Sequence, residues 1–370
     1  MEVRKVENKG DLRRFIEFPY RLYQNDPVWV PPLRKEQWHH FDPSHNPMLN
    51  HCDYGLFLLQ DRGQVVGRVS AFVDRLALKF WNKPIGLFGS YECVDDDEGS
   101  RLLLETARTW LQEHDMKMMR GPWSFASQEW GLVIEGFTPP PVVLAPHNPP
   151  YYIHQLNVFG MEKAKDLLVY YADSKEGFQI PERYLALAKK VQKEYGIKLR
   201  SLDMSRLEEE ITTIVEIINR SIGTNWGFRP VTGEEARAMA RDLKPILDPK
   251  AVVIAEGPNG EAIGFSISIP DINILLRGLN GRLFPFGWLK LMYGIPHLKK
   301  FRIWGLGIVP EYQMKGVGPL LYCHTYEMLY SRGVSLEINW VLEDNDRMNN
   351  ALHKLGVKFL RRYRVYEMTI

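Results

Sequence analysis

The sequence has 370 residues, more than one typical hydrophobic core organises, so its length favours about two domains. With 45% hydrophobic and 25% charged residues, the composition is that of an ordinary soluble globular protein. Lys and Arg number 47 against 45 Asp and Glu, and the net charge of +2 gives no electrostatic reason to expect a nucleic-acid partner.

The N-terminal stretch MEVRKVENKGDLRRFIEF is charged and lacks the apolar centre of a signal peptide. Nowhere does an apolar run reach the ~20 residues that span a bilayer. We therefore expect a cytoplasmic protein with no membrane span. The cysteines are odd in number and scattered, which favours free thiols over a disulfide framework; they are Cys52, Cys93 and Cys323.

Four histidines lie close together in the first quarter of the chain: His39, His40, His45 and His51. Prolines interrupt this stretch, and the spacing is not that of metal ligands on a helix. We interpret these residues as loop histidines, and the sequence predicts no metal site.

The carboxylates of 95–98, Asp-Asp-Asp-Glu, precede a helix predicted over Arg101–Glu113. Acidic residues at a helix N-terminus interact favourably with the helix dipole. The alternative is a metal site, but adjacent acids lack the spaced oxygen ligands of a calcium loop. We favour the structural interpretation.

Residues 121–152 are rich in proline, glycine and aromatic side chains. Because proline fixes the backbone and aromatic rings give rigid contact area, this segment could line a cleft between domains. A stiff connection that packs on the neighbouring sheet explains the same composition.

The two halves of the chain resemble each other. Residues 57–72 and 253–268 both predict a β-hairpin whose second strand begins at a glycine, Gly67 or Gly264. Near the end of each half, a glycine precedes a strand tyrosine by ten residues: 170 − 160 = 10 and 366 − 356 = 10. This self-similarity predicts tandem domains, 1–172 and 173–370, joined at the polar stretch Ala172–Gly177.

In the second half, apolar residues at helical spacing predict helices over Pro181–Tyr195 and Glu208–Asn219. The loop Asn219–Pro230 follows, and Thr232 with Glu235 forms a capping box that begins the next helix.

An insertion at 273–300 mixes Phe284, Phe286, Trp288 and other apolar residues with lysine and arginine. Such a segment could cover an acyl chain, contact a lipid surface or dock a second subunit. It could equally be a lid that packs on its own domain. It is too short and too interrupted to span a bilayer.

The most informative stretch is WGLGIVPEYQMKGVG, residues 304–318. It predicts an apolar strand over Trp304–Val309, a turn, and then a glycine-rich start to a helix over Pro319–Ser331. Glycines at 316 and 318 leave room for backbone N–H groups to converge on an anion such as a diphosphate.

Gln313-x-x-Gly316-x-Gly318 after a strand resembles motif A of the GCN5-related N-acetyltransferases (GNAT), of a tandem-domain bacterial type. A strand at Glu337–Leu342, then Asn345 and Lys354-Leu-Gly356-Val, continues the resemblance. The resemblance implies an α/β (α+β) fold with two GNAT-like domains. In each, helices would flank a mixed, mainly antiparallel central sheet.

The resemblance also implies that the second domain binds acetyl-CoA or another acyl-CoA as co-substrate, without a metal. The implied cofactor-binding residues are Ile308, Val309, Gln313, Met314, Lys315, Gly316, Val317, Gly318 and Asn345. Of these, Ile308 and Val309 would supply backbone N–H donors to the oxyanion. The first domain has acids where the phosphate loop would lie, and these would repel a diphosphate. We expect a degenerate domain there.

In the family fold, the loop between the first two helices contributes to the acceptor site, and the resemblance makes Asn225, Trp226 and Phe228 of the loop Asn219–Pro230 candidates for contacting the acceptor. The acceptor would be a small-molecule or peptide amine. Transfer requires a neutral amine, hence a base or a desolvating site, and loss of the thiolate is helped by a proton donor.

In the family that donor is commonly a tyrosine, and this chain has Leu352 at its position. Glu337, Asn339 and Tyr312 could approach the thioester, although the motif places none of them. Two hypotheses follow: an acyl-CoA-dependent N-acyltransferase that protonates the thiolate by another route, and a non-catalytic protein that binds or senses acyl-CoA.

Overall fold

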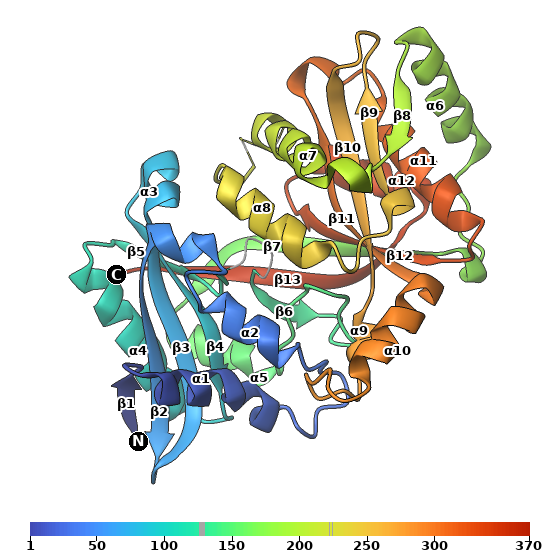
Figure 1. Cartoon of the computed structure of the whole chain (residues 1–370). Coiled ribbons are helices and arrows are strands. Elements are labelled where there is room, and N and C mark those ends of the chain that lie inside the picture. The colour runs from blue at the N-terminus through green and yellow to red at the C-terminus, as the bar shows by residue number, and fades with distance from the viewer. Residues whose placement is uncertain (126–129, 222, 224) are drawn as a thin grey trace. The chain divides into compact units, whose positions relative to one another are not determined.

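The computed structural model describes residues 1–370 except 126–129, 222 and 224. The chain forms two compact units (Figure 1). Unit 1 comprises Met1–Leu167, Leu275–Leu289 and Arg361–Ile370, and unit 2 comprises Leu168–Ile274 and Lys290–Leu360. Each unit therefore contains residues from both halves of the sequence.

The helices and strands of the first half follow this order: β1 (Glu2–Lys5), α1 (Lys9–Leu22), α2 (Arg34–His40), β2 (Cys52–Asp61), β3 (Gln64–Asp74), α3 (Arg75–Trp81), β4 (Ile85–Cys93), α4 (Asp97–Glu113), β5 (Met118–Gly121), β6 (Leu132–Glu135), α5 (Tyr151–Val158) and β7 (Glu162–Asp173).

Those of the second half are α6 (Glu182–Glu194), β8 (Lys198–Ser201), α7 (Leu207–Ser221), α8 (Gly233–Leu243), β9 (Val252–Glu256), β10 (Ala262–Pro270), α9 (Asn273–Leu276), α10 (Gly287–Gly294), β11 (Lys300–Ile308), α11 (Val317–Tyr330), β12 (Ser335–Leu342), α12 (Asp346–Leu355) and β13 (Lys358–Thr369).

The sheets of the two units have the same pattern, which confirms the tandem α/β fold. In unit 1, β1, β2, β3 and β4 pair antiparallel and β4 pairs parallel with β5. In unit 2, β8, β9, β10 and β11 pair antiparallel and β11 pairs parallel with β12. The predicted hairpins are β2–β3 and β9–β10.

Helices cover both faces of each sheet. In unit 1, a Cβ on Gly67 would meet Leu103 of α4, whereas Arg68, the next residue, donates a hydrogen bond to the carbonyl of Phe15 in α1. Because successive strand residues point to opposite faces, α4 and α1 lie on opposite sides of the sheet. Gly264 has the corresponding role in unit 2, where its Cβ would meet Leu321 of α11.

The strand that follows the parallel pair comes from the other half of the sequence. In unit 1, β5 pairs antiparallel with β13, where Tyr366 lies opposite Gly121. In unit 2, the neighbour of β12 is β7. We call this arrangement the strand exchange. Within unit 1, Asp166 of β7 pairs with Arg364 of β13, with Nε and Oδ1 2.7 Å apart.

The polar stretch Ala172–Gly177, predicted as a linker, is structured. It contains the end of β7 and a 3₁₀ turn over Ser174–Glu176. The carboxylate of Asp173 accepts a hydrogen bond from the amide of Lys175 at 2.7 Å, and Gly177 ends the turn with φ 83°. Local side-chain capping explains the polar composition as well as a linker does.

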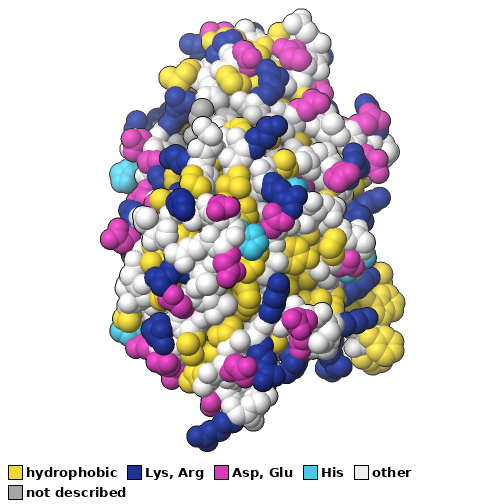
Figure 2. Space-filling view, turned by 90° about the vertical axis from the view of Figure 1, so that its left-hand side faces the viewer, with side chains coloured by type: hydrophobic (Ala, Val, Ile, Leu, Met, Phe, Trp, Pro, Cys, Tyr) yellow, Lys and Arg dark blue, Asp and Glu magenta, His cyan; other side chains and the backbone are white. Residues whose placement is uncertain are grey.

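The surface mixes charges of both signs. Figure 2 shows Lys and Arg side chains (dark blue) interspersed with Asp and Glu (magenta) on the face in view, consistent with the net charge of +2. Among the described helices, none is both long enough and apolar enough to cross a membrane.

Tyr366 tests the strand exchange. Its side chain is 1% exposed and belongs to the core of unit 1 with Met119 of β5. Tyr366→Ala should lower the free energy of unfolding by about 3–5 kcal/mol, since it removes a buried ring from that core. Urea denaturation followed by circular dichroism measures this loss. Phe359→Ala on the same strand, 42% exposed, is the control and should cost about 1 kcal/mol or less; equal losses would contradict the assignment.

Candidate functional site

The glycine-rich loop joins β11 to α11 in unit 2. After Ile308 the chain makes a 3₁₀ turn over Pro310–Tyr312, and α11 begins at Val317. The Gln313 side chain fastens the loop, because its Nε2 donates to the carbonyl of Ile308 at 3.1 Å. Met314 has φ 63° and is 84% exposed. The loop therefore reverses direction with its tip in solvent.

Gly316 is the N-cap of α11, and its backbone requires glycine. Its φ of 80° lies in the left-handed region, and a Cβ there would stand 2.8 Å from Cγ2 of Val191 in α6. Any side chain at this position would both strain the backbone and displace α6.

The first turn of α11 presents free backbone donors. Within the described residues, the amides of Gly316, Val317 and Gly318 have no hydrogen-bond acceptor, and Val317 and Gly318 are buried. These three successive N–H groups lie at the positive end of the helix dipole of α11. This geometry can hold a diphosphate.

Strands β11 and β12 diverge beside this loop. They pair only from Lys300 opposite Ser335 to Ile303 opposite Ile338. Over the described residues, the last part of β11 (308 − 303 = 5 residues) and of β12 (342 − 338 = 4 residues) have no pairing with each other. Over these residues, the edge of β11 that faces β12 therefore has no pairing partner, whereas the other edge still pairs with β10.

The direction of those groups corrects one expectation. The amide of Val309 donates to the carbonyl of Ile263 at 3.0 Å, so Val309 cannot supply the oxyanion donor assigned to it. In an antiparallel pair, hydrogen-bonded and non-hydrogen-bonded positions alternate. Since Val309 bonds to β10, Ile308 and Leu306 direct their N–H groups away from β10, towards the divergence. Leu306 is a candidate donor that sequence reasoning missed.

A narrow apolar pocket, with a cavity volume of about 40 Å³, lies beside the divergence, within unit 2. Its polar lining residues are Ser266, Tyr322 and Tyr326. A smaller pocket, with a cavity volume of about 10 Å³, shares Ala172, Phe178, Tyr326 and Leu336 with it. The other lining residues of the larger pocket are Ile180, Ile303, Leu306, Ile338, Met348, Leu352, Leu355 and Val357. Most side chains that line the two pockets are apolar.

Tyr322 links this pocket to the loop. It lies on α11, lines the pocket with Leu352, and its Oη would be 3.2 Å from a Cβ placed on Gly318. Burial raises the pKa of Tyr322 to about 12, so the phenol carries its proton at neutral pH. Its position, one helical turn after Gly318, is a signal that the sequence contained.

Glu337 and Asn339 lie away from the pocket. Ile338 between them lines the pocket, so strand alternation directs both side chains to the opposite face of the sheet. Glu337 is fully buried, and its Oε2 is 3.2 Å from Nζ of Lys300. Its Oε1 accepts from Nδ2 of Asn339 at 3.3 Å. The ion pair with Lys300 explains why a carboxylate can be buried at position 337 without a catalytic role.

Tyr312 is not close to Glu337. Its hydroxyl donates to Oε1 of Glu261 at 2.9 Å, and this hydrogen bond raises its pKa. In the register of β11 with β12, Glu337 lies opposite Arg302, which is six residues before the end of β11 (308 − 302 = 6). At about 3.3 Å per strand residue, that is roughly 20 Å of strand. The structure does not bring the predicted catalytic residues together.

The predicted acceptor residues lie on the loop between α7 and α8. Asn225 is exposed, whereas Phe228 is 7% exposed and belongs to the core. The capping box is confirmed: Glu235 accepts from the amide of Thr232 at 2.8 Å, and Thr232 Oγ1 accepts from the amide of Glu235 at 3.2 Å. Asn345 also has a capping role, since its side chain accepts from the amide of Met348 at 3.1 Å.

The corresponding helix of the first half closes its own N-terminus. Asp96 caps α4, and its carboxylate accepts from the amide of Gly99 at 2.6 Å. Asp97 and Glu98 occupy the first turn. The acids therefore do what the structural interpretation proposed, and α4 begins at Asp97 rather than at the predicted Arg101.

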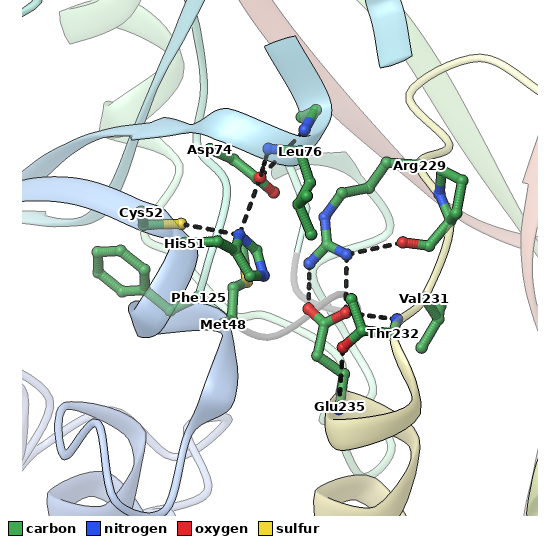
Figure 3. Close-up of polar contacts among 12 residues, drawn as sticks. Met48, His51, Cys52, Asp74, Leu76, Phe125, Arg229, Val231, Thr232 and Glu235 are labelled. Carbon is green, nitrogen blue, oxygen red and sulfur yellow. Dashed lines mark hydrogen bonds and ion pairs between the residues drawn. The ribbon is translucent and has the colours of Figure 1, made fainter. Parts of the chain in front are cut away.

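Figure 3 shows the residues of unit 1 that could hold a metal ion: His51, Cys52 and Asp74, whose ligand atoms lie within 4.8 Å of one another. Nδ1 of His51 is 3.1 Å from Oδ1 of Asp74. The same oxygen caps α3 by accepting from the amides of Leu76 and Ala77. Capping of α3 explains why Asp74 is buried, and the contact with His51 adds a second partner to the same carboxylate.

Gly316 provides a test of the loop. Gly316→Asp should abolish acetyl-CoA binding, because the side chain would fill and charge the space above the free amides. Isothermal titration calorimetry of the unaltered chain should give about one site per chain. Gly333→Asn is the control, since Gly333 also has a positive φ but no atom within 4 Å of an added Cβ. Retained affinity in Gly316→Asp would mean that the donor binds elsewhere.

Comparison with known proteins places these features in a family. No family model matches the chain. Protein YghO of Escherichia coli is 34% identical over 376 residues, which cover 100% of this chain and 95% of that protein. Bacterial ceramide synthase of Caulobacter vibrioides is 35% identical over 379 residues, which cover 100% of this chain and 98% of that protein.

Solved structures share the fold. A tandem GNAT protein from the clavulanic acid biosynthesis pathway has a TM-score of 0.59 at 13% identity, covering 100% of this chain and 98% of that one. A GCN5-related N-acetyltransferase from Sphaerobacter thermophilus has a TM-score of 0.55 at 13% identity, covering 100% and 95%. The chain therefore belongs to the family of Protein YghO and bacterial ceramide synthase, and it has the fold of the tandem GCN5-related N-acetyltransferases.

Proposed function

We propose that this protein transfers a fatty acyl group from an acyl-CoA thioester to the primary amine of a long-chain acceptor. The observation that carries the proposal is the narrow apolar pocket of unit 2, whose lining residue Tyr322 also lies beside Gly318 of the glycine-rich loop. The loop of unit 2 would hold the diphosphate, and the divergence of β11 and β12 would receive the arm that ends in the thioester.

The lining of the pocket favours a fatty acyl-CoA over acetyl-CoA. The amide groups of the pantetheine arm need hydrogen-bond partners when they are buried, and an apolar lining does not supply them. A hydrocarbon chain needs none, and each buried methylene contributes about 0.8 kcal/mol. Leu352, only 3% exposed and without a polar group, is well suited to contact such a chain.

The acceptor is proposed from a relative. Bacterial ceramide synthase matches the whole of this chain, and a ceramide is an N-acylated long-chain amino alcohol. A long-chain amine is therefore the acceptor class to test first, and small amines and peptides are the alternatives. The loop residues Asn225 and Trp226 remain candidates for contacting it.

In the proposed reaction, the neutral amine nitrogen attacks the thioester carbonyl, a C–N bond forms, and the C–S bond breaks. The N–H groups of Leu306 and Ile308 stabilise the oxyanion. Tyr322 donates its proton to the departing thiolate and recovers one from solvent, while the amine loses a proton to water. Tyr322 thus takes the role that the family tyrosine would have had at position 352.

The choice of donor can be tested by chain length. With a long-chain amine as acceptor, release of free CoA thiol should be faster with fatty acyl-CoA than with acetyl-CoA. Ala172→Leu should lower the apparent affinity for the longest donors, because the leucine occupies the part of the pocket that both cavities share.

Acetyl-CoA is the internal control, because its acyl group is too short to reach the substituted wall, and its affinity should not change in Ala172→Leu. Equal affinities for acetyl and fatty donors in the unaltered protein would contradict a fatty acyl pocket. Tight donor binding without thiol release across a panel of amines would favour the non-catalytic hypothesis.

Tyr322→Phe tests the proton donor. The variant should lose about 10²-fold in kcat, at the lower end of what general acid catalysis contributes, with little change in donor KM. Tyr326→Phe is the matched control, since Tyr326 lines the same pocket and its hydroxyl donates to the carbonyl of Phe178 at 3.4 Å. Leu352→Tyr in the Tyr322→Phe background should restore part of the rate. An unchanged kcat in Tyr322→Phe would move the proton route elsewhere.

A further inference from the structure

The segment around α10 differs in character from the rest of the surface. Phe284 is 87% exposed, Phe286 73%, and Trp288 50%. Met292 and Tyr293, farther along α10, are also more than half exposed. We call residues 282–293 the aromatic segment. It exposes five large apolar side chains within twelve residues, far more than the isolated exposed residues normal for a soluble surface.

The charge of this part of the chain has a single sign. No acidic residue occurs between Asp271 and Glu311, whereas the whole protein is nearly neutral at +2. Within the aromatic segment, the basic residues are Arg282 and Lys290, both exposed. Aromatic and aliphatic side chains flanked by basic ones fit the boundary of an anionic lipid layer, where the rings enter the headgroup region and the cations meet phosphates.

Hydrogen bonds to residues near the start of the chain fix the backbone just before the aromatic segment. Within unit 1, the amide of Arg34 donates to the carbonyl of Gly281 at 2.9 Å, and Arg277 Nη2 donates to the carbonyl of Pro27 at 2.7 Å. A Cβ on Gly281 would stand 2.5 Å from the carbonyl oxygen of Pro32, so the backbone lies directly on the chain beneath it.

The turn between these anchors and α10 is closed by its own hydrogen bonds. The amide of Trp288 donates to the carbonyl of Leu283 at 3.1 Å, and its indole Nε1 donates to the carbonyl of Pro285 at 3.0 Å. Phe284 and Phe286 therefore project from a fixed turn, and their exposure does not depend on a disordered loop. A preorganised turn loses little conformational entropy when it inserts.

We propose that the aromatic segment docks the protein on an anionic lipid bilayer. The rings of Phe284, Phe286 and Trp288 enter the headgroup boundary, and Arg282 and Lys290 contact lipid phosphates. Binding to a bilayer does not require acyl transfer, so each of the two proposals can be tested without the other. If both are correct, the segment would bring the enzyme to the surface where long-chain amines reside.

The test uses the full chain and flotation with vesicles of phosphatidylglycerol mixed with phosphatidylcholine, and with phosphatidylcholine alone. We expect binding to the anionic vesicles that weakens as salt is raised. Phe284→Ser with Phe286→Ser should reduce the partition coefficient at least about tenfold, because two large apolar surfaces are lost. Arg282→Glu with Lys290→Glu should abolish the preference for anionic vesicles.

Matched controls are available on the same chain. Phe80→Ser with Val158→Ser removes exposed apolar side chains elsewhere in unit 1, and Arg13→Glu with Lys193→Glu removes exposed positive charges elsewhere. Both should bind as the unaltered protein does. Thermal unfolding checks that each variant is folded.

Two results would overturn the proposal. One is flotation that is absent in the unaltered protein or equal in all the variants. The other is concentration-dependent association in sedimentation equilibrium that Phe284→Ser with Phe286→Ser removes, without vesicle binding; the segment would then join two copies of the chain.

Discussion

The divergence of β11 from β12 is the constraint on which the site depends. A parallel pair that continued to the ends of both strands would satisfy the N–H groups of Leu306 and Ile308 and close the pocket against the sheet. Pairing stops at Ile303 and Ile338. Beyond that point, the N–H groups of Leu306 and Ile308 face away from β10, and Leu306 also lines the apolar cavity. The substituted helix position, Leu352, lies in the wall of that cavity.

The same structural position has opposite electrostatics in the two halves. In α11 the N-cap is Gly316, which has no side chain, and the amides that follow it have no acceptor among the described residues. In α4 the N-cap is Asp96, whose carboxylate satisfies the amide of Gly99. Because its own carboxylates occupy the N-terminal amides and the positive end of the dipole, α4 has no favourable site for a diphosphate. One repeat thus leaves the N-terminal amides of its helix open, and the other satisfies them with its own carboxylate.

The features that could be predicted from the sequence are those that depend on neighbouring residues. The hairpins, the glycine-rich turn and the capping box at Thr232 depend on residues close together in the chain, and the structure contains them. The pocket could not be read in this way, because it is lined by residues from Ala172 to Val357 that meet only through the fold. Tyr322 was overlooked because its distance of one helical turn from Gly318 is visible in the sequence, but its place in the lining of the pocket is not. The donor at Val309 was misassigned because hydrogen-bond direction depends on register with β10.

The strand exchange was also beyond sequence reasoning, since β7 and β13 end their halves with similar patterns and either could pair with either sheet. Its consequence concerns how the chain can be divided or could have arisen. A single repeat on its own would have to pair its last strand with its own sheet, whereas two identical repeats could also exchange these strands as an intertwined dimer. The present chain has the connectivity of such a dimer fused end to end. If it were severed near residue 173, the two fragments would be expected to reassemble by mutual strand insertion, each acting as the template for the other.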